Sequence, residues 1–161
     1  MELVKFDNVL AVDPGENCGI ALFRDEKLAL VHLIKSKDTE HLAKEFGEYI
    51  SSLVYEGRIA SIIEVPQIYK NSPVNPNRIA TLAFLAGALF AKLTSVSALT
   101  RVVIPHEWKG TVPKEIHNKR ILKKLDMEET AILGQCVSSI PPSLVNNVVD
   151  AIGLGLYLIQ R

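Results

Sequence analysis

The sequence contains few cysteines, and those it has are poorly placed for a cysteine-based site. Cys18 and Cys136 are the only two among 161 residues, and they form no CxxC motif. No cluster of other ligands surrounds either of them in the sequence. We therefore expect neither a disulfide framework nor a thiolate zinc site, and a reducing cytoplasm suits the chain.

The sequence also has no apolar leader and no long apolar run. Glu2, Lys5 and Asp7 stand where a secretion signal would place apolar residues, and the longest uncharged apolar-rich run covers residues 79–91. This run is shorter than the about 20 residues that a membrane helix needs. We expect a soluble, untargeted, cytoplasmic protein without a membrane partner.

Net charge is absent, because eighteen basic residues balance eighteen acidic ones. The chain is therefore not one that coats nucleic acid through bulk charge. Residues 101–124 nevertheless carry seven basic side chains against two acidic ones, so this stretch is +5 and the remainder −5; the basic residues are Arg101, Lys109, Lys114, Lys119, Arg120, Lys123 and Lys124. Such a local face can bind phosphates, although a solvated amphipathic helix has the same pattern.

Short β-type runs come first, and strands alternate with helices afterwards. Residues 9–13, 19–24 and 28–33 predict three antiparallel strands. A helix should begin at Asp38 or Thr39 and end near Gly57. We then expect a strand over 59–64, a loop over 71–77, a largely apolar helix over 79–93, a strand over 101–105, and helices over 114–125, 128–137 and 143–159. This predicts one α/β domain over 1–161, with a mixed five-stranded sheet of three antiparallel and then two parallel strands flanked by helices.

Two predicted buried strands end on an acid. Asp13 ends the first and precedes a Pro-Gly turn, and Glu64 ends the fourth. In the last helix Asp150 is the only charge between residues 143 and 160, and Asn147 lies one turn earlier on the same side. Taken singly, a strand-end acid often forms a salt bridge, and a lone helical Asp usually faces solvent.

These residues converge if the first and fourth strands adjoin and the last helix packs across their ends. Carboxylates gathered in this way repel one another, which raises their pKa values unless cations neutralise them. Oxygen ligands without thiolates or paired histidines suit Mg²⁺ or Mn²⁺ rather than zinc. Two such ions can activate a water and stabilise the leaving oxygen of a phosphodiester.

In this order of motifs the chain resembles the RuvC family of Holliday junction resolvases, within the ribonuclease-H-like superfamily. The matching features are the Asp13-Pro-Gly turn with Gly19 opening the next strand, Glu64 followed by the Lys70-Asn pair, and Asp150-Ala in the last helix. The resemblance runs nearly from end to end of the chain. It implies a ribonuclease-H-like fold.

The resemblance also implies a Mg²⁺-dependent (or Mn²⁺-dependent) endonuclease that resolves Holliday junctions and other branched DNA, in recombination and repair, in a bacterial cell or a phage-infected host. The family's metal ligands correspond to Asp13, Glu64, Asn147 and Asp150, for two ions per subunit. Its catalytic or phosphate-contacting lysines correspond to Lys109 and Lys114. The residues that we expect to contact DNA are Tyr69, Lys70, Lys109, Lys114, Lys119 and Arg120. The family works as two-fold dimers, for which the helix over 79–93 is the candidate face.

The chain departs from the family at two positions. Asn147 stands where the family has Asp or His, and a neutral oxygen binds divalent metal less strongly. Gln67 stands where the family has an aromatic residue that contacts bases, and Tyr69 is the nearest substitute. Trp108 and His117 suit a DNA contact, but a lone Trp is more often a core or rim residue, and a lone His an ordinary surface residue.

Three other functions fit parts of the pattern. A ribonuclease-H-like enzyme acting on RNA or ribosomal RNA precursors shares the acids. A catalytically inactive protein that binds branched DNA shares the basic segment. Actin-like and sugar-kinase ATPases share the Asp-x-Gly turn at Asp13, but they need a second domain, for which 161 residues leave no room, so no nucleotide cofactor is expected.

Overall fold

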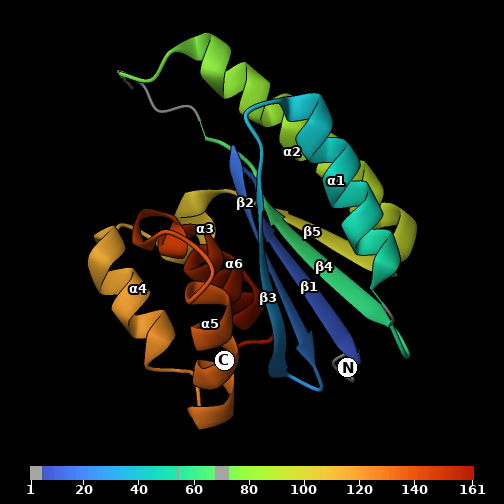
Figure 1. Cartoon of the computed structure of the whole chain (residues 1–161), viewed down its shortest axis with the longest axis vertical. Coiled ribbons are helices and arrows are strands. Elements are labelled where there is room, and N and C mark those ends of the chain that lie inside the picture. The colour runs from blue at the N-terminus through green and yellow to red at the C-terminus, as the bar shows by residue number, and fades with distance from the viewer. Residues whose placement is uncertain (1–4, 54, 68–72) are drawn as a thin grey trace.

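A computed structural model of the chain describes residues 5–53, 55–67 and 73–161. Tyr69 and Lys70, two of the predicted DNA contacts, lie outside the described residues. The strands are β1 (Asn8–Asp13), β2 (Asn17–Arg24), β3 (Lys27–Lys35), β4 (Ile59–Glu64) and β5 (Leu99–Val103). They form one sheet in the order β3-β2-β1-β4-β5 (Figure 1).

The direction of the strands confirms the predicted mixed sheet. β2 runs antiparallel to both β1 and β3, whereas β4 runs parallel to β1 and β5 parallel to β4. β1 is buried along its whole length, as a central strand covered on both faces must be. The first and fourth strands therefore adjoin, which is the arrangement that the convergence of the acids requires.

Helices cover both faces of the sheet (Figure 1). α1 (Thr39–Ser52) and α2 (Pro76–Val96) pack on one face, where Phe46 and Leu89 are fully buried. α6 (Val145–Leu158) crosses the other face against β1 and β2, with α4 (Lys114–Leu122) packed on it and α5 (Met127–Val137) packed on β3. The sheet thus separates two apolar cores.

The bounds of several elements differ from the predicted ones. β5 ends at Val103 rather than residue 105, and Pro105 begins a helix that the sequence did not predict, α3 (Pro105–Lys109). Proline lacks the amide hydrogen that a strand needs and suits the first turn of a helix. α1 ends at Ser52, short of Gly57, and a 3₁₀ turn, η1 (Pro142–Leu144), precedes α6.

α2 (Pro76–Val96) is longer at both ends than the predicted helix over 79–93. Its 21 residues have a mean hydropathy of 1.8 in their most apolar window, which is long and apolar enough to cross a membrane by length and composition. The core helix of a protein without a membrane has the same property. Leu85, Leu89 and Leu93 lie in the core beneath the sheet, whereas Phe84 on the outer side is 69% exposed. Packing explains the apolar inner face, whereas the part of the chain that the structure describes leaves the outer face uncovered.

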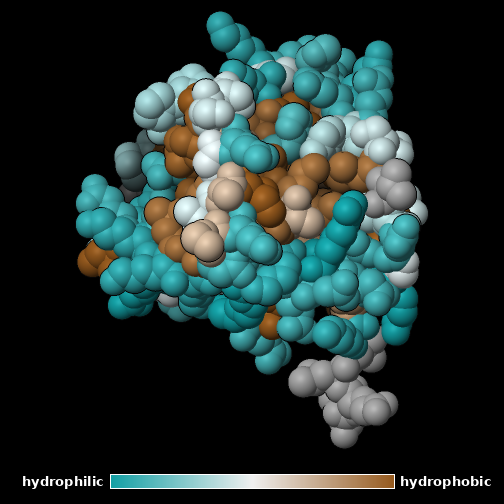
Figure 2. Space-filling model, turned by 60° about the horizontal axis from the view of Figure 1, so that its bottom comes forward, coloured by the Kyte–Doolittle hydropathy of each residue, from teal (hydrophilic) through white to brown (hydrophobic). Residues whose placement is uncertain are grey.

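The opposite end of the sheet from the acids carries apolar surface. Figure 2, which looks toward the lower end of Figure 1, shows apolar side chains gathered across the middle of this face. A hollow of about 400 Å³ at the start of β1 and β5 is lined in part by Phe6, Val9, Leu99, Leu158 and Ile159. Lys5, Glu26 and Arg101 line it as well, so the hollow is mixed in character. Since Asp13 and Glu64 end their strands, it is separate from the site of these acids.

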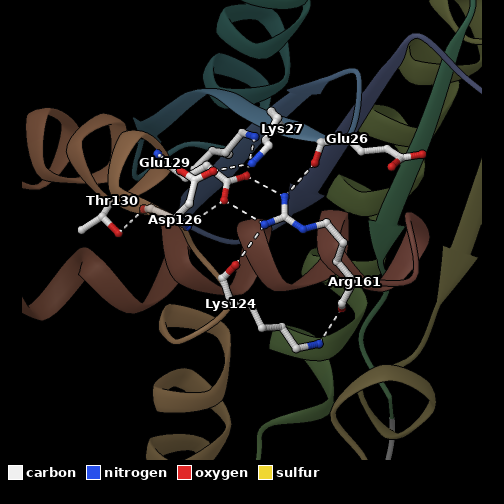
Figure 3. A network of polar contacts seen from close by, with 8 residues as sticks. Glu26, Lys27, Lys124, Asp126, Glu129, Thr130 and Arg161 are labelled. Carbon is white, nitrogen blue, oxygen red and sulfur yellow. Dashed lines mark hydrogen bonds and ion pairs between the residues drawn. The ribbon is translucent and has the colours of Figure 1, made fainter.

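A polar network fastens residue 161 to the sheet (Figure 3). Glu129 in α5 is 1% exposed, and its carboxylate receives two hydrogen bonds from the Arg161 guanidinium, at 2.6 and 2.8 Å. It also accepts the backbone N–H groups of Leu28 and Asp126, and Asp126 forms an ion pair with Lys27. A buried carboxylate with this many donors is fully compensated. The network ties β3, α5 and residue 161 together.

Candidate active site

Asp13 and Glu64 lie at one edge of the sheet because their strands are parallel and in register. Val12 is the partner of Ile63 in the β1–β4 pair, and each of the two acids is the next residue along its strand. Asp13 is 9% exposed, and the side chain of Glu64 is 14% exposed. The backbone ladder, rather than a loop, therefore brings the two acids together.

Gly19 brings the last helix onto this edge. Gly19 is the cross-strand partner of Asp13 in the β1–β2 pair. A Cβ atom at Gly19 would lie 2.0 Å from the backbone oxygen of Asn147, so only glycine allows β2 and α6 to approach this closely. Asp150 follows one turn later and is 3% exposed. The helical Asp is therefore buried toward the sheet and does not face solvent.

The three acids share one electrostatic environment. Burial raises the pKa of Asp13 well above its ordinary value, and the negative charges of Glu64 and Asp150 raise it further. Lys109 and Lys114 act in the opposite direction and lower it. This balance is the one expected of clustered carboxylates that nearby cations compensate in part.

Two lysine ammonium groups supply the compensating charge. Lys109 Nζ lies 3.2 Å from Glu64 Oε2 and 3.6 Å from Asp150 Oδ2, and Lys114 Nζ lies 3.1 Å from the same Asp150 oxygen. Burial lowers the pKa of Lys109, but Glu64, Asp150 and Asp13 outweigh it and raise the pKa above its ordinary value. Lys109 is thus held charged between two of the acids.

Trp108 contacts the same group of side chains. Its indole Nε1 donates a hydrogen bond of 2.6 Å to Glu64 Oε2, and Lys109 Nζ lies 4.5 Å from the centre of its ring. His117 of α4 packs edge-on against the indole at 4.9 Å, and burial lowers the pKa of this half-buried imidazole. Trp108 is therefore a buried residue beside the acids, and His117 is not an ordinary surface histidine.

The oxygen ligands suit a divalent cation, although no ion-binding cluster is preformed. Within the described residues no three His, Cys, Asp or Glu side chains are placed to hold a metal ion. Asp150 Oδ1 is buried without a hydrogen-bond partner among the described residues, and Asn147 Nδ2 donates a hydrogen bond to the Leu144 carbonyl at 3.2 Å. Carboxylate and amide oxygens are the ligands that Mg²⁺ and Mn²⁺ prefer. The residues present therefore fit such an ion in the chemistry of their oxygen atoms, although their spacing is not that of a formed metal site.

The basic segment lies next to this group of acids. Lys114 is the first residue of α4 and contacts Asp150, whereas Lys119 and Arg120 are exposed further along the same helix. Lys109 is less exposed, because it points toward Glu64 and Asp150. Of the predicted DNA contacts, the structure thus places Lys109 and Lys114 at the acids, and Lys119 and Arg120 on the adjoining surface.

Sequence comparison and structural comparison give different results. No family model and no curated protein matches the sequence. Thermus thermophilus RuvC in complex with a Holliday junction substrate is similar in structure, with a TM-score of 0.62 and 17% identity, over 93% of this chain and 90% of that one. A second T. thermophilus RuvC structure gives 0.52 and 14%, over 93% and 92%. The yeast mitochondrial Holliday junction resolvase gives 0.54 and 11%, over 94% and 80%.

At these identities the similarity defines the fold. The chain has the ribonuclease-H-like fold of the RuvC-type resolvases, which confirms the fold expected from its motifs. The low identity also explains why sequence comparison finds nothing, since a sheet and its packing tolerate wide substitution. What the chain does must be argued from its own side chains.

Proposed function

We propose that this protein is a metal-dependent endonuclease that hydrolyses phosphodiester bonds in Holliday junctions and other branched DNA. The observation that carries the proposal is the meeting of Asp13, Glu64 and Asp150 at one edge of a RuvC-type sheet, with lysines directly against them. Two of the similar structures are named as Holliday junction resolvases or bound to such a junction. Acids and lysines in this arrangement suit chemistry on a phosphate.

Asp13, Glu64 and Asp150 would hold Mg²⁺ or Mn²⁺, with Asn147 as a weaker ligand and two ions per subunit in the complete site. Bound ions supply an activated water and stabilise the charge on the leaving oxygen. Lys109 and Lys114 neutralise the acids in the metal-free protein. Once an ion supplies that charge, Lys114 at the start of α4 is free to bind the phosphate being cut.

The exposed face of α4 would bind the arms of the DNA. Lys119 and Arg120 extend the positive charge of Lys114 away from the acids. Contacts of this kind position a duplex without reading its sequence, and they weaken as salt rises. Tyr69 and Lys70 belong to the same proposed interface. Selectivity for branched DNA then comes from shape.

A homodimer through α2 would supply that shape selection. Exposed small or aromatic residues recur along the outer side of the helix at helical spacing: Ala80, Ala83, Phe84, Gly87 and Ala91. Small residues allow two helices to approach closely, and an exposed apolar face of this length marks an interaction surface. Two subunits related by a two-fold axis would cut two strands of a junction symmetrically.

The test is cleavage of a labelled four-way junction, a linear duplex and an RNA–DNA hybrid in Mg²⁺ or Mn²⁺ by the wild type and by Asp13→Asn. We expect the wild type to cut the junction and the variant to bind it without cutting. Equal cutting of the linear duplex would contradict selectivity for branched DNA. Preferential cutting of the hybrid would assign the site to RNA. Tight binding without cutting by the wild type would identify an inactive junction-binding protein.

A further inference from the structure

Trp108 lies in a closed space between three elements. Its side chain is buried at 9% exposure, at the end of α3. A Cβ atom at Gly153 of α6 would lie 2.7 Å from the indole Cζ3 and 2.5 Å from Ile121 Cδ1 of α4. The absence of a side chain at Gly153 therefore makes room for the ring. The His117 ring closes another side, so the indole has little freedom to move.

The Trp108 ring is held against the same helix that carries the third acid. Gly153 lies three residues after Asp150, so the two positions occupy one side of α6. The indole thus rests one turn along from the Asp150 carboxylate. Packing against α6 and α4 holds the ring in this place.

From this fixed position the indole reaches Glu64 with its single polar atom. Nε1 can only donate a hydrogen bond, and its acceptor is Glu64 Oε2 at 2.6 Å. The same oxygen receives the Lys109 ammonium, which in turn lies over the indole face at 4.5 Å. A hydrogen bond to a charged group and a cation over an aromatic face both fix geometry as well as lowering energy. One side chain thus restrains both an acid and a lysine.

We propose that Trp108 is a positioning residue, which orients the Glu64 carboxylate for metal binding through its indole N–H and holds Lys109 beside that carboxylate with its ring. This inference rests on the proposed function, because it assigns Glu64 to an ion. Groups that orient a metal ligand in this way, when removed, typically cost about 10- to 100-fold in metal affinity or activity. In this role Trp108 would act through Glu64 and Lys109 and would not itself be a ligand of the ion.

The first experiment measures Mn²⁺ binding without DNA, by electron paramagnetic resonance of the free ion. Trp108→Phe keeps an aromatic ring and removes the N–H donor, and we expect it to lose about 10- to 100-fold in affinity. Ile50→Val is the matched control, because it is a conservative change at a fully buried position in the core on the other face of the sheet, away from Trp108 and Glu64. We expect the control to bind Mn²⁺ as the wild type does. Wild-type affinity in Trp108→Phe would overturn the proposal.

The second experiment uses the fluorescence of the wild-type indole, which is the only tryptophan in the sequence. Glu64→Met removes the acceptor, so we expect the Trp108 emission maximum to shift. Glu115→Met removes an exposed acid from α4 and serves as the control, with unchanged emission. Because this measurement needs no change at Trp108, it tests the contact between Trp108 and Glu64 even where Trp108→Phe folds poorly. Unchanged emission in Glu64→Met would overturn the proposal.

Failure of the inference and failure of the proposed function give different results. A protein that cuts no branched DNA but loses Mn²⁺ affinity in Trp108→Phe would contradict the nuclease and leave the role of Trp108 intact. If the protein is a nuclease and Trp108→Phe binds Mn²⁺ as tightly as the wild type, only the proposed role of Trp108 is contradicted. Absence of any Mn²⁺ binding by the wild type would overturn both.

Discussion

The backbone oxygen of Asn147 lies against Gly19, at a distance that leaves no room for even a methyl group. Gly19 is paired with Asp13 across the sheet, and Asn147 precedes Asp150 by one helical turn. This contact therefore sets the distance between the acid on β1 and the acid on α6. A glycine with no chemistry of its own determines how the site is built.

Gly19→Ala is expected to destabilise the protein and to weaken Mn²⁺ binding together. The added methyl group meets backbone rather than a flexible side chain, and overpacking of this kind costs about 1–3 kcal/mol. Urea unfolding measures the first effect, and titration with Mn²⁺ the second. Gly134→Ala in α5 is the control. A Cβ atom there meets none of the described residues within 4 Å, and alanine is favoured over glycine in a helix by about 1 kcal/mol. A Gly19→Ala protein as stable as the wild type would show that α6 shifts without cost.

Asp13→Asn is expected to abolish cleavage and to stabilise the metal-free protein. The folded-state pKa of Asp13 is raised by burial and by its acidic neighbours, so the folded chain holds this proton more tightly than the unfolded chain does. The carboxyl group therefore favours folding at acid pH, and its ionisation opposes folding as the pH rises to neutral. Removing the charge should add roughly 0.5–2 kcal/mol at pH 7 without metal.

The comparison for Asp13→Asn is made by thermal unfolding with and without Mg²⁺. Bound Mg²⁺ stabilises only a protein that can hold it, so the advantage of the variant should shrink or reverse as Mg²⁺ is added. If Asp13→Asn is less stable than the wild type in the absence of Mg²⁺, the electrostatic account of Asp13 is wrong.

Asn147→Asp is expected to strengthen metal binding at the expense of the metal-free fold. A fourth carboxylate would add a charged ligand for the ion, but it would also repel Asp150 and would lose the hydrogen bond that Asn147 Nδ2 donates to the Leu144 carbonyl. The loss of this bond alone should cost about 0.5–1.5 kcal/mol. Calorimetric titration with Mn²⁺ gives the affinity and the number of ions. An unchanged ion count and affinity would place Asn147 outside the metal site.

Glu129→Gln is expected to destabilise the protein at neutral pH by about 3 kcal/mol and by much less in acid. The hydrogen bonds from Arg161 lower the pKa of Glu129 from 4.5 to about 2. Because the folded-state pKa is depressed, the stabilisation is present above pH 4.5 and is lost as the pH falls toward 2. Urea unfolding at pH 7, 4 and 3 follows this loss. Glu128→Gln, an exposed neighbour in the same helix, should show no such dependence.

Phe84→Glu is expected to convert a dimer into a monomer without loss of fold. Phe84 is 69% exposed on α2, so a charge there costs little in the isolated subunit but opposes burial against a second copy. Sedimentation velocity measures the mass. Met127→Glu makes the same change at an 87% exposed position on α5 and should leave the dimer intact. If the wild type is a monomer, or if both variants remain dimers, α2 is not the dimer interface. Binding of the wild type to lipid vesicles would instead show that the outer face of α2 contacts a membrane.

The sequence predicts the sheet well because its signals are local. Buried runs that end on Asp13 and Glu64 define strands, and the breaks around them define turns. α3 was missed because five residues show no helical period, and Pro105 was assigned to the preceding strand. α2 was predicted too short because its polar ends hide the helical pattern. Element bounds depend on packing that a single segment does not reveal.

The contacts among the site residues were harder to predict than their identities. The acids follow from strand ends and from the lone charge in the last helix. The hydrogen bond from Trp108 to Glu64 joins residues 44 positions apart, and no periodicity in the sequence predicts such a contact. The only signal was one tryptophan directly before Lys109. Likewise, the family resemblance predicted Lys109 and Lys114 as catalytic or phosphate-contacting lysines, but their ion pairs with the acids depend on the fold.

The three acids of the site are synthesised at different times. They come from the beginning, the middle and the last part of the chain. A ribosome that has synthesised only the five strands has made two of the three acids, and the third can dock only after residue 150 has emerged. Long-range contacts of this sort form late in folding. A partly made chain would therefore lack the complete acidic site.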